Sequence, residues 1–203
     1  MKKLFFLLVI AVVSCSKTDN LPNDTSEVIE TYECSSATFP EWSTSNYVLP
    51  YPIGKSYQIG LGPCTGSYHH SGKPDQFAID FNMPIGSIIT SSTNGEVVYV
   101  EESGIDYQFP NNLIIVKYGD VFVQYMHLTK NGALVKVGDS VYKGQILGMS
   151  GATGLAGYPH LHFVVTTSTG IEYVYGSVPV TFKNTDANPK SLESGKTYIA
   201  KPY

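Results

Sequence analysis

Residues 157–165 have the sequence GYPHLHFVV, which places two histidines at the start of a strand-like run. In an extended strand, residues i and i+2 project from the same face, so His160 and His162 lie roughly 6.5–7 Å apart along one face. The opposite face then receives three apolar side chains, Leu161, Phe163 and Val165. The stretch therefore predicts a strand that packs on a core with one side and carries two imidazoles on the other.

Short runs rich in β-branched and aromatic residues continue this pattern from residue 77 onward. Turn signals such as Asn94-Gly95, Gly119-Asp120 and Asn131-Gly132 separate them about every ten residues. The expected strands cover residues 77–81, 88–90, 96–100, 113–118, 121–128, 133–137, 145–149, 162–167 and 173–175. Because the chain after the amino terminus contains no long amphipathic pattern, we expect an all-β, mainly antiparallel sandwich or barrel-like fold.

The amino terminus has the layout of a secretory signal. Two lysines precede an apolar run at residues 4–13, which is too short to span a membrane, and small residues surround Cys15. Residues 12–15 (VVSC) are similar to a bacterial lipobox, which implies cleavage before Cys15 and lipidation of that residue. A plain secretory signal with an incidental cysteine is the alternative. Both alternatives predict an exported protein.

The composition after this signal divides the chain into a tether and one domain. We expect a signal peptide at residues 1–14, a polar, flexible tether at 15–31 and a folded domain at 32–203. Lysine and arginine together number 13 against 17 acidic residues, a formal net charge of −4. Nucleic-acid binding depends on clustered positive charge, so this balance argues against a nucleic-acid partner.

Cys34 and Cys64 are the only cysteines beyond Cys15. An even pair in an exported chain makes a disulfide plausible, and it would fasten the amino-terminal arm to the segment before His69. Two unpaired buried thiols are the alternative, because bridging depends on the separation and direction of the Cα atoms. The pair lacks the Cys-x-x-Cys spacing of a metal site.

Four of the five histidines and one aspartate form a candidate zinc site. Asp80 lies in an apolar strand, where a carboxylate is costly unless it is paired or binds a metal. One histidine of the 69/70 pair, Asp80 and one of His160 and His162 would supply the three protein ligands of a catalytic zinc. The second histidine of the 160/162 pair, together with His127, would then serve as general acid or base. A His-Glu-x-x-His motif is missing, so histidine must handle the proton.

These residues stand in motifs that resemble the lysostaphin and LytM-like zinc metallopeptidases, family twenty-three of the metallopeptidases, over about residues 48–167. The matching stretches, in family order, are HSG at 70–72, AIDF at 78–81, MPIG at 83–86, NGEV at 94–97, YMHL at 125–128, VGDSV at 137–141 with GQ at 144–145, GATG at 151–154 and PHLHF at 159–163. Each motif is weak alone, but together they are specific. The resemblance implies a lysostaphin-like fold with an active-site groove.

The resemblance also implies roles for the site residues. His70, Asp80 and His162 would bind one zinc ion, and His127 and His160 would act on the attacking water and the developing oxyanion. In the family the first histidine and the aspartate usually lie closer, whereas residues 71–79 intervene here. That spacing leaves His69 as a substitute ligand. We favour His70 because Ser-Gly follows it, as the family motif requires.

The implied function is a zinc endopeptidase that cuts peptidoglycan peptides. With the lipobox, it predicts a monomer attached to the cell envelope by a lipid anchor, with the outer membrane and periplasm as the expected location and the membrane leaflet left open. A non-catalytic relative that binds peptidoglycan or activates another hydrolase is the second hypothesis. A structural surface lipoprotein with coincidental histidines is the third, and it would require four histidines to fall on motif positions by chance.

Overall fold

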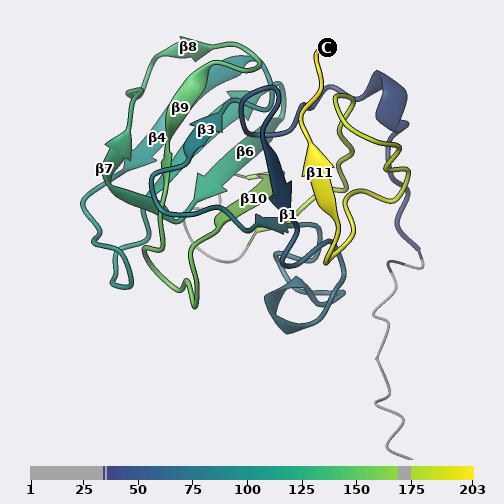
Figure 1. The fold of residues 1–203 in the computed structure, drawn as a ribbon, viewed down its shortest axis with the longest axis horizontal. Helices are drawn as coiled ribbons and strands as arrows, with labels where there is room; N and C mark the ends of the chain where they lie inside the picture. Colours follow the sequence, from purple (N-terminus) through teal and green to yellow (C-terminus); the bar gives the residue numbers. More distant parts are fainter. Residues whose placement is uncertain (1–33, 35, 169–174) are drawn as a thin grey trace, which may run out of the picture.

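The computed structural model describes residues 34, 36–168 and 175–203 of the chain (Figure 1). Their elements are, in order, η1 (Trp42–Thr44), β1 (Ser56–Gln58), η2 (Ser67–His69), β2 (Ile79–Phe81), β3 (Ile88–Thr90), β4 (Gly95–Glu101), β5 (Leu113–Tyr118), β6 (Val121–Met126), β7 (Leu128–Ala133), β8 (Ser140–Val141), β9 (Ile146–Ser150), β10 (Leu161–Thr166) and β11 (Thr197–Ile199). The signal at 1–14, the lipidation at Cys15 and the tether at 15–31 lie outside the described residues.

The elements confirm the predicted all-β fold. The two helical elements of the described chain, η1 and η2, are single 3₁₀ turns. Every named strand pairing is antiparallel. Within the described residues there is no helix with the length and apolar character needed to cross a membrane.

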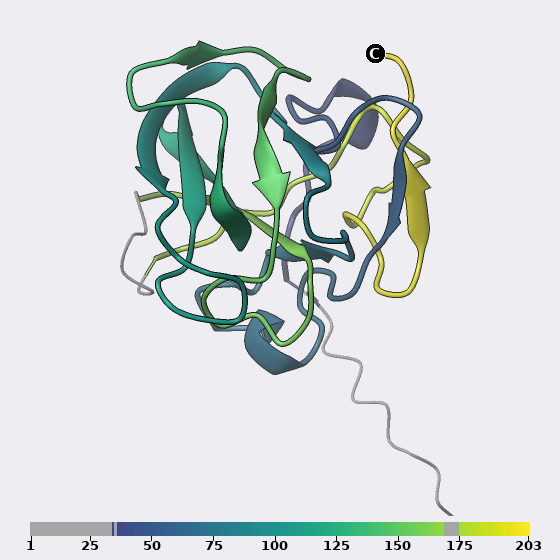
Figure 2. The ribbon, with the colours of Figure 1, turned by 60° about the vertical axis from the view of Figure 1, so that its left-hand side comes forward.

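The strands form three sheets. The largest has six strands in the order β2-β10-β6-β5-β4-β8, and a second has the order β3-β9-β7. Strands β1 and β11 pair as a small separate sheet, which Figure 2 shows to one side of the other two. In the six-stranded sheet β10 lies between β2 and β6, so two neighbouring strands flank the histidine-bearing strand.

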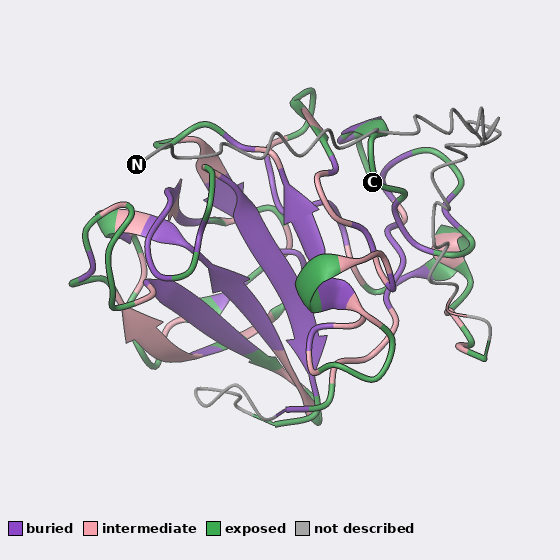
Figure 3. Cartoon of the chain, turned by 90° about the horizontal axis from the view of Figure 1, so that it is seen from below, coloured by how far each residue is buried: buried purple, intermediate pink, exposed green. Residues whose placement is uncertain are grey.

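The main core lies on the face of β10 opposite its histidine. Leu161, Phe163 and Val165 belong to the large buried cluster, as the alternation of residue types predicts. Phe163 contacts the rings of Tyr125 and Phe182, with centroids 5.5 and 5.7 Å away. Figure 3 shows buried strands at the centre of the fold: β2 and β10 are buried along their whole length, whereas most of β4 is only partly buried. The rigid, packed face of β10 therefore fixes where the opposite face presents its imidazole.

Two predicted strands differ from the structure. The run at 121–128 is interrupted at His127, which has a positive φ of 64° and separates β6 from β7. The strand predicted at 133–137 is wrong, because β7 ends at Ala133 and only Leu134 makes a further backbone hydrogen bond to β9, at Leu147. Leu134 and Val137 are 58% and 60% exposed, whereas Ala133 and Val135 are partly buried against the main core. The strand predicted at 173–175 lies mostly outside the described residues.

The segments before β1 and after β10 are attached to the sheets by a disulfide and by core contacts. Cys34 and Cys64 form a disulfide with a Cα–Cα distance of 5.5 Å, which ties the start of the described chain to the segment that leads into η2. Near the carboxyl end, Phe182 and Tyr198 join the main core. The chain after residue 175 is thus part of the folded unit.

Candidate metal centre and active site

The antiparallel register of β10 brings the site residues together. His162 lies opposite Asp80 on β2 and opposite Met126 on β6. Residues directly across an antiparallel ladder share a face of the sheet, so the His162 and Asp80 side chains meet. His127 follows Met126 directly, and His160 lies just before β10, where it forms a bridge with Gly151.

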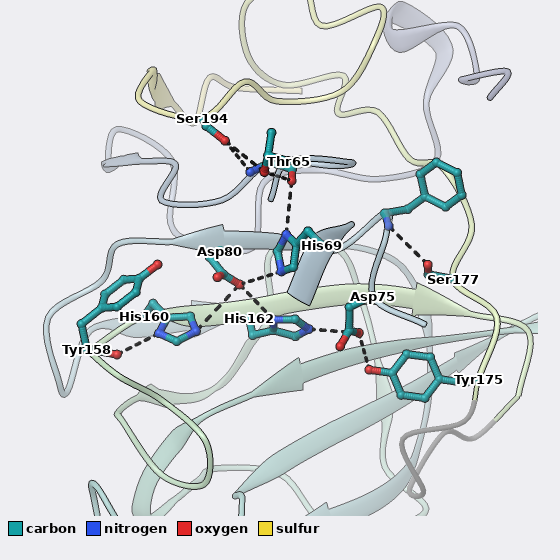
Figure 4. Close-up of polar contacts among 12 residues, drawn as sticks. Thr65, His69, Asp75, Asp80, Tyr158, His160, His162, Tyr175, Ser177 and Ser194 are labelled. Atoms are coloured by element: carbon teal, nitrogen blue, oxygen red, sulfur yellow. Dashed lines mark hydrogen bonds and ion pairs between the residues drawn. The ribbon is translucent and has the colours of Figure 1, made fainter. Parts of the chain in front are cut away.

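The first cluster consists of His69, Asp80 and His162. His69 Nε2 lies 3.5 Å and His162 Nδ1 lies 2.9 Å from the same carboxylate oxygen of Asp80, Oδ1 (Figure 4). One ligand atom from each residue lies within 4.8 Å of the other two, and all three side chains are buried. His69 reaches this position because it ends the short helix η2, whose preceding loop turns the ring inward.

This donor set fits a zinc ion. Two imidazoles and a carboxylate are ligands that zinc favours, and a catalytic zinc has three protein ligands. Tetrahedral bonds of the usual length would hold ligand atoms about 3.3 Å apart. The two distances to the Asp80 oxygen fall on either side of that value, so small side-chain adjustments suffice for metal binding.

The neighbours of His69 and His162 indicate which ring nitrogen of each histidine faces Asp80. His69 Nδ1 lies 3.2 Å from the carbonyl oxygen of Gly62, which can only accept a hydrogen bond. Nδ1 therefore carries the proton, and Nε2 presents its lone pair toward Asp80. The ring of His162 lies between two carboxylates, with Asp80 beside Nδ1 and Asp75 3.4 Å from Nε2.

The second cluster consists of His127, His160 and His162, again with ligand atoms within 4.8 Å of one another. His127 Nδ1 donates to the carbonyl of Thr153 at 2.7 Å, and His160 Nδ1 donates to that of Tyr158 at 2.8 Å. Since carbonyls cannot donate, both neutral rings carry their lone pair on Nε2. His160 Nε2 lies 3.8 Å from Asp80, so this lone pair faces the first cluster.

The backbone and ring contacts of this pair limit its freedom. His127 adopts a left-handed φ of 64°, unusual for a residue with a side chain, and its N–H donates to Asn111 Oδ1. Such conformations often occur at functional sites. The ring of Tyr158 stacks on that of His160, with centroids 4.5 Å apart. Both imidazoles are therefore held in one orientation.

The two carboxylates create a strongly negative environment around His162. Burial alone would raise the pKa of Asp80, but His162 and His69 outweigh it and hold this pKa well below its usual range. Burial alone would lower the pKa of His162, but Asp75 and Asp80 raise it to about 10. A metal ion needs the neutral imidazole, so at this position it would take the place of the proton that the carboxylates attract.

The second pair of histidines is neutral near pH 7. Burial, with the neighbouring His162 and His160, lowers the pKa of His127 to about 3. Burial also lowers the pKa of His160. Both rings are therefore neutral and keep a lone pair on Nε2, although burial makes each a weaker base than a free imidazole, whose pKa lies nearer the value that suits a general base.

The structure separates the two adjacent histidines of the 69/70 pair. His69 is 1% exposed and lies against Asp80, whereas His70 is half-buried and belongs to neither of the two clusters found among the described residues. The sequence favoured His70 because of the following Ser-Gly. The structure places the alternative, His69, beside the other two predicted ligands, because η2 directs only one of two neighbouring side chains inward.

Two polar residues beside His162 were missed from the sequence. Asp75 is 5% exposed, and the hydroxyl of Tyr175 donates a hydrogen bond to it. Asp75 lies in the segment 71–79 that lengthens the connection between the histidine pair and Asp80. The only signal in the sequence was an acidic residue within that extra segment, and Tyr175 gave none.

A groove with a volume of about 720 Å³ exposes both clusters. Its walls carry large apolar side chains that reach into solvent: Tyr68 (55% exposed), Phe109 (73%) and Leu155 (63%). Leu155 and Gly157 come from the glycine-rich loop that follows the GATG motif. A cleft of this size, with apolar walls and a few convergent polar groups, is typical of a ligand or substrate site.

Comparisons with known proteins agree with this geometry. Residues 75–174 match peptidase family M23. The peptidoglycan DD-endopeptidase ShyB of Vibrio cholerae is 32% identical over 152 residues, which are 70% of this chain and 33% of that protein. The glycyl-glycine endopeptidase ALE-1 of Staphylococcus capitis is 36% identical over 62% of this chain and 31% of its own length. Lysostaphin of Staphylococcus simulans is 37% identical over 59% of this chain and 21% of its own length.

The chain thus spans about a third or less of the length of these relatives. Among solved structures, the antimicrobial peptidase lysostaphin from Staphylococcus simulans is 35% identical over 55% of this chain and 42% of that chain, with a TM-score of 0.43.

Proposed function

Because the chain carries a domain of peptidase family M23, we propose that it is a zinc-dependent endopeptidase that hydrolyses peptide bonds in peptidoglycan. The observation that carries the proposal is the convergence of His69, Asp80 and His162 beneath an open groove, with His127 and His160 facing the same point. The name of ShyB, a peptidoglycan DD-endopeptidase, supports a substrate of this class, and that of ALE-1, a glycyl-glycine endopeptidase, supports hydrolysis of a peptide bond.

In this proposal His69, Asp80 and His162 hold the metal. His69 contributes Nε2, Asp80 contributes Oδ1 and His162 contributes Nδ1, the three atoms that already lie together. When bound there, zinc supplies Lewis-acid catalysis to the hydrolysis of a carbonyl group. His70 remains outside the ligand set.

His127 and His160 handle the proton. Each neutral ring presents Nε2 toward the groove and donates its Nδ1 proton to a backbone carbonyl. One of them accepts a proton from the attacking water as the new C–O bond forms. The proton then passes to the leaving amine as the peptide C–N bond breaks. Nε2 of the other ring lies beside the same point, and it would need a second proton there to donate a hydrogen bond to the developing oxyanion.

The groove has room for an extended peptide, the substrate proposed here. Its floor carries the histidines and Asp80, and its walls carry exposed side chains including Tyr68, Phe109 and Leu155. An extended chain can lie along such a groove with its scissile carbonyl above the floor. The bond could be a direct cross-link, a stem bond or a glycine bridge, and the apolar walls do not favour one of them.

The cellular setting is part of the same proposal. A peptidoglycan substrate requires export, which agrees with the signal expected at residues 1–14. We further propose that Cys15 is lipidated and that residues 15–31 tether a monomeric domain, residues 32–203, to the outer membrane, facing the periplasm. The polar tether would give the domain reach into the cell wall.

The alternative function is non-catalytic binding of peptidoglycan or activation of another hydrolase. Both the metal-ligand cluster and the two additional histidines are complete here, whereas a binding protein has no need of a proton-accepting pair. This favours the enzyme.

A digestion experiment separates the two functions. Purified peptidoglycan is incubated with the zinc-loaded protein, with its His162→Ala variant and with Asp120→Asn, a control in the exposed turn between β5 and β6. Mass spectrometry then identifies new peptide ends. We expect new ends with the natural protein and the control, and none with His162→Ala. Binding to the wall without new ends, from a folded zinc-loaded protein, would support the alternative.

A further inference from the structure

The far nitrogen of His162 has a different environment from that of the other site histidines. His69, His127 and His160 each donate from Nδ1 to a backbone carbonyl. His162 uses Nδ1 toward Asp80, and its buried Nε2 lies 3.4 Å from Asp75 Oδ1 without completing a hydrogen bond of good geometry. The partner of this ring is therefore a side-chain carboxylate rather than a carbonyl.

Asp75 is itself held in place. Its side chain is buried, and the Tyr175 hydroxyl donates to the oxygen that faces His162 (Figure 4). Tyr175 is 8% exposed and packs with Val164 and Met126 on this side of the sheet. A buried carboxylate is costly without such partners. Asp75 is therefore buried at a free-energy cost, although the proposed hydrolysis does not use it directly.

We propose that Asp75, held by Tyr175, is a positioning residue that accepts the Nε2 proton of His162 and so directs the Nδ1 lone pair to the zinc. The proposal rests on the ligand assignment made above. Histidine ligands of metals almost always donate their other N–H to an outer acceptor, and a carboxylate acceptor also increases the basicity of the ligand.

The position of Asp75 favours this role over direct metal binding. Asp75 and Asp80 lie on opposite edges of the His162 ring, and the clusters of metal-ligand atoms found in the described chain include only Asp80. Asp75 belongs to the segment 71–79 that separates the histidine pair from Asp80. That segment would thus supply a functional group in addition to linking two ligands.

Zinc affinity tests the proposal without reference to catalysis. Competition with a chromophoric chelator is measured on the full chain for the natural protein, Asp75→Asn, Tyr175→Phe and the control Asp120→Asn. We expect roughly 10- to 100-fold weaker zinc binding for Asp75→Asn. Tyr175→Phe keeps the carboxylate and should show a smaller loss, while the control should match the natural protein.

A nuclear magnetic resonance measurement distinguishes positioning from general structural support. In the zinc-loaded, histidine-labelled protein, the proton on Nε2 of His162 should resonate far downfield because a carboxylate accepts it. It should move upfield in Asp75→Asn, and a smaller movement should occur in Tyr175→Phe. If Asp75→Asn fails to fold, as judged by its circular dichroism, the Tyr175→Phe shift and zinc affinity decide the question.

The outcomes separate this proposal from the one on which it rests. His162→Ala should abolish tight zinc binding. If it does not, the ligand assignment itself is wrong. If His162→Ala loses zinc but folded Asp75→Asn retains the natural affinity and the same Nε2 proton shift, the positioning role of Asp75 is overturned and the ligand assignment stands.

Discussion

Each histidine in the site has two ring nitrogens, and the two have different neighbours in the structure. For His69, His127 and His160 a backbone carbonyl takes the Nδ1 proton, so the neutral ring can present only Nε2 to the groove. The carbonyls that set the tautomers of His69 and His160 belong to nearby residues, Gly62 and Tyr158, whereas the one beside His127 comes from the more distant Thr153. In the proposed mechanism, one of these three similar rings is then a metal ligand and the other two are proton acceptors, according to what lies in front of Nε2.

The two histidines outside the proposed ligand set should be separable from metal binding. Replacing His127 or His160 by Gln should lower kcat by about 10²- to 10⁴-fold, the usual contribution of general acid–base catalysis. Zinc content should remain one ion per chain, because neither residue is among the proposed ligands. Hydrolysis rates and metal analysis on the same preparations check this. Loss of zinc in either variant would instead indicate that the second cluster binds the metal.

Adjacent histidines provide a matched pair at the first ligand position. His69→Ala should lose tight zinc binding, because its Nε2 lies 3.5 Å from Asp80 in a buried site. His70→Ala should retain it, since that side chain lies outside the cluster. Chelator competition on both variants measures the difference. The reverse result would restore the assignment that the Ser-Gly motif favoured.

At the residue scale, motif spacing in the sequence predicted Asp80, His127, His160 and His162 as neighbours. It favoured His70, whereas the structure brings His69 beside Asp80, because the choice depends on how a single 3₁₀ turn is oriented. It also could not find Asp75, since a carboxylate in a polar segment gives no sign that the chain will bury it beside His162.

At the scale of elements, β10 positions the site because one of its faces packs on the core and the other bears His162. The apolar face packs on Phe81, Tyr125 and Phe182 through Phe163, while His162 projects from the other face toward Asp80. Period-two alternation predicted this division from the sequence. The break at His127 was not predicted, because a left-handed residue within an apolar run leaves no mark on the pattern.

Truncation of the packed face should destabilise the whole sheet. Phe163 is fully buried, so Phe163→Ala should lower the free energy of unfolding by about 3–5 kcal/mol. Urea denaturation measures the change. Tyr142→Ala is the control, because Tyr142 is 66% exposed and its loss should have little effect. Similar stabilities for the two variants would contradict the packing described for β10.

At the scale of the whole molecule, antiparallel strands from residues 79 to 166 and a carboxyl-terminal segment share one core. Turn signals and β-branched runs predicted the all-β class. They did not predict that residues 180–200 would contribute Val180, Phe182, Leu192 and Tyr198 to that core, since the prolines and polar residues there give no strand-like period.

Buried tyrosines should make the protein sensitive to alkali. Burial raises the pKa of Tyr47 to about 12 and also raises that of Tyr125. Above pH 10 the unfolded chain loses these protons while the folded chain keeps them, so stability present below pH 10 is lost as the pH rises. Denaturation at pH 9, 10 and 11 should show a falling free energy of unfolding. Tyr125→Phe should fall less steeply, and a constant stability over this range would contradict the burial of these phenols.

X-ray diffraction at the zinc absorption edge, from crystals of the zinc-loaded protein, tests the site assignment most directly. The assignment predicts one anomalous peak bounded by His69 Nε2, Asp80 Oδ1 and His162 Nδ1, with Nε2 of His127 and His160 facing it across the groove. A peak on His70, or one centred among His127, His160 and His162, would contradict it.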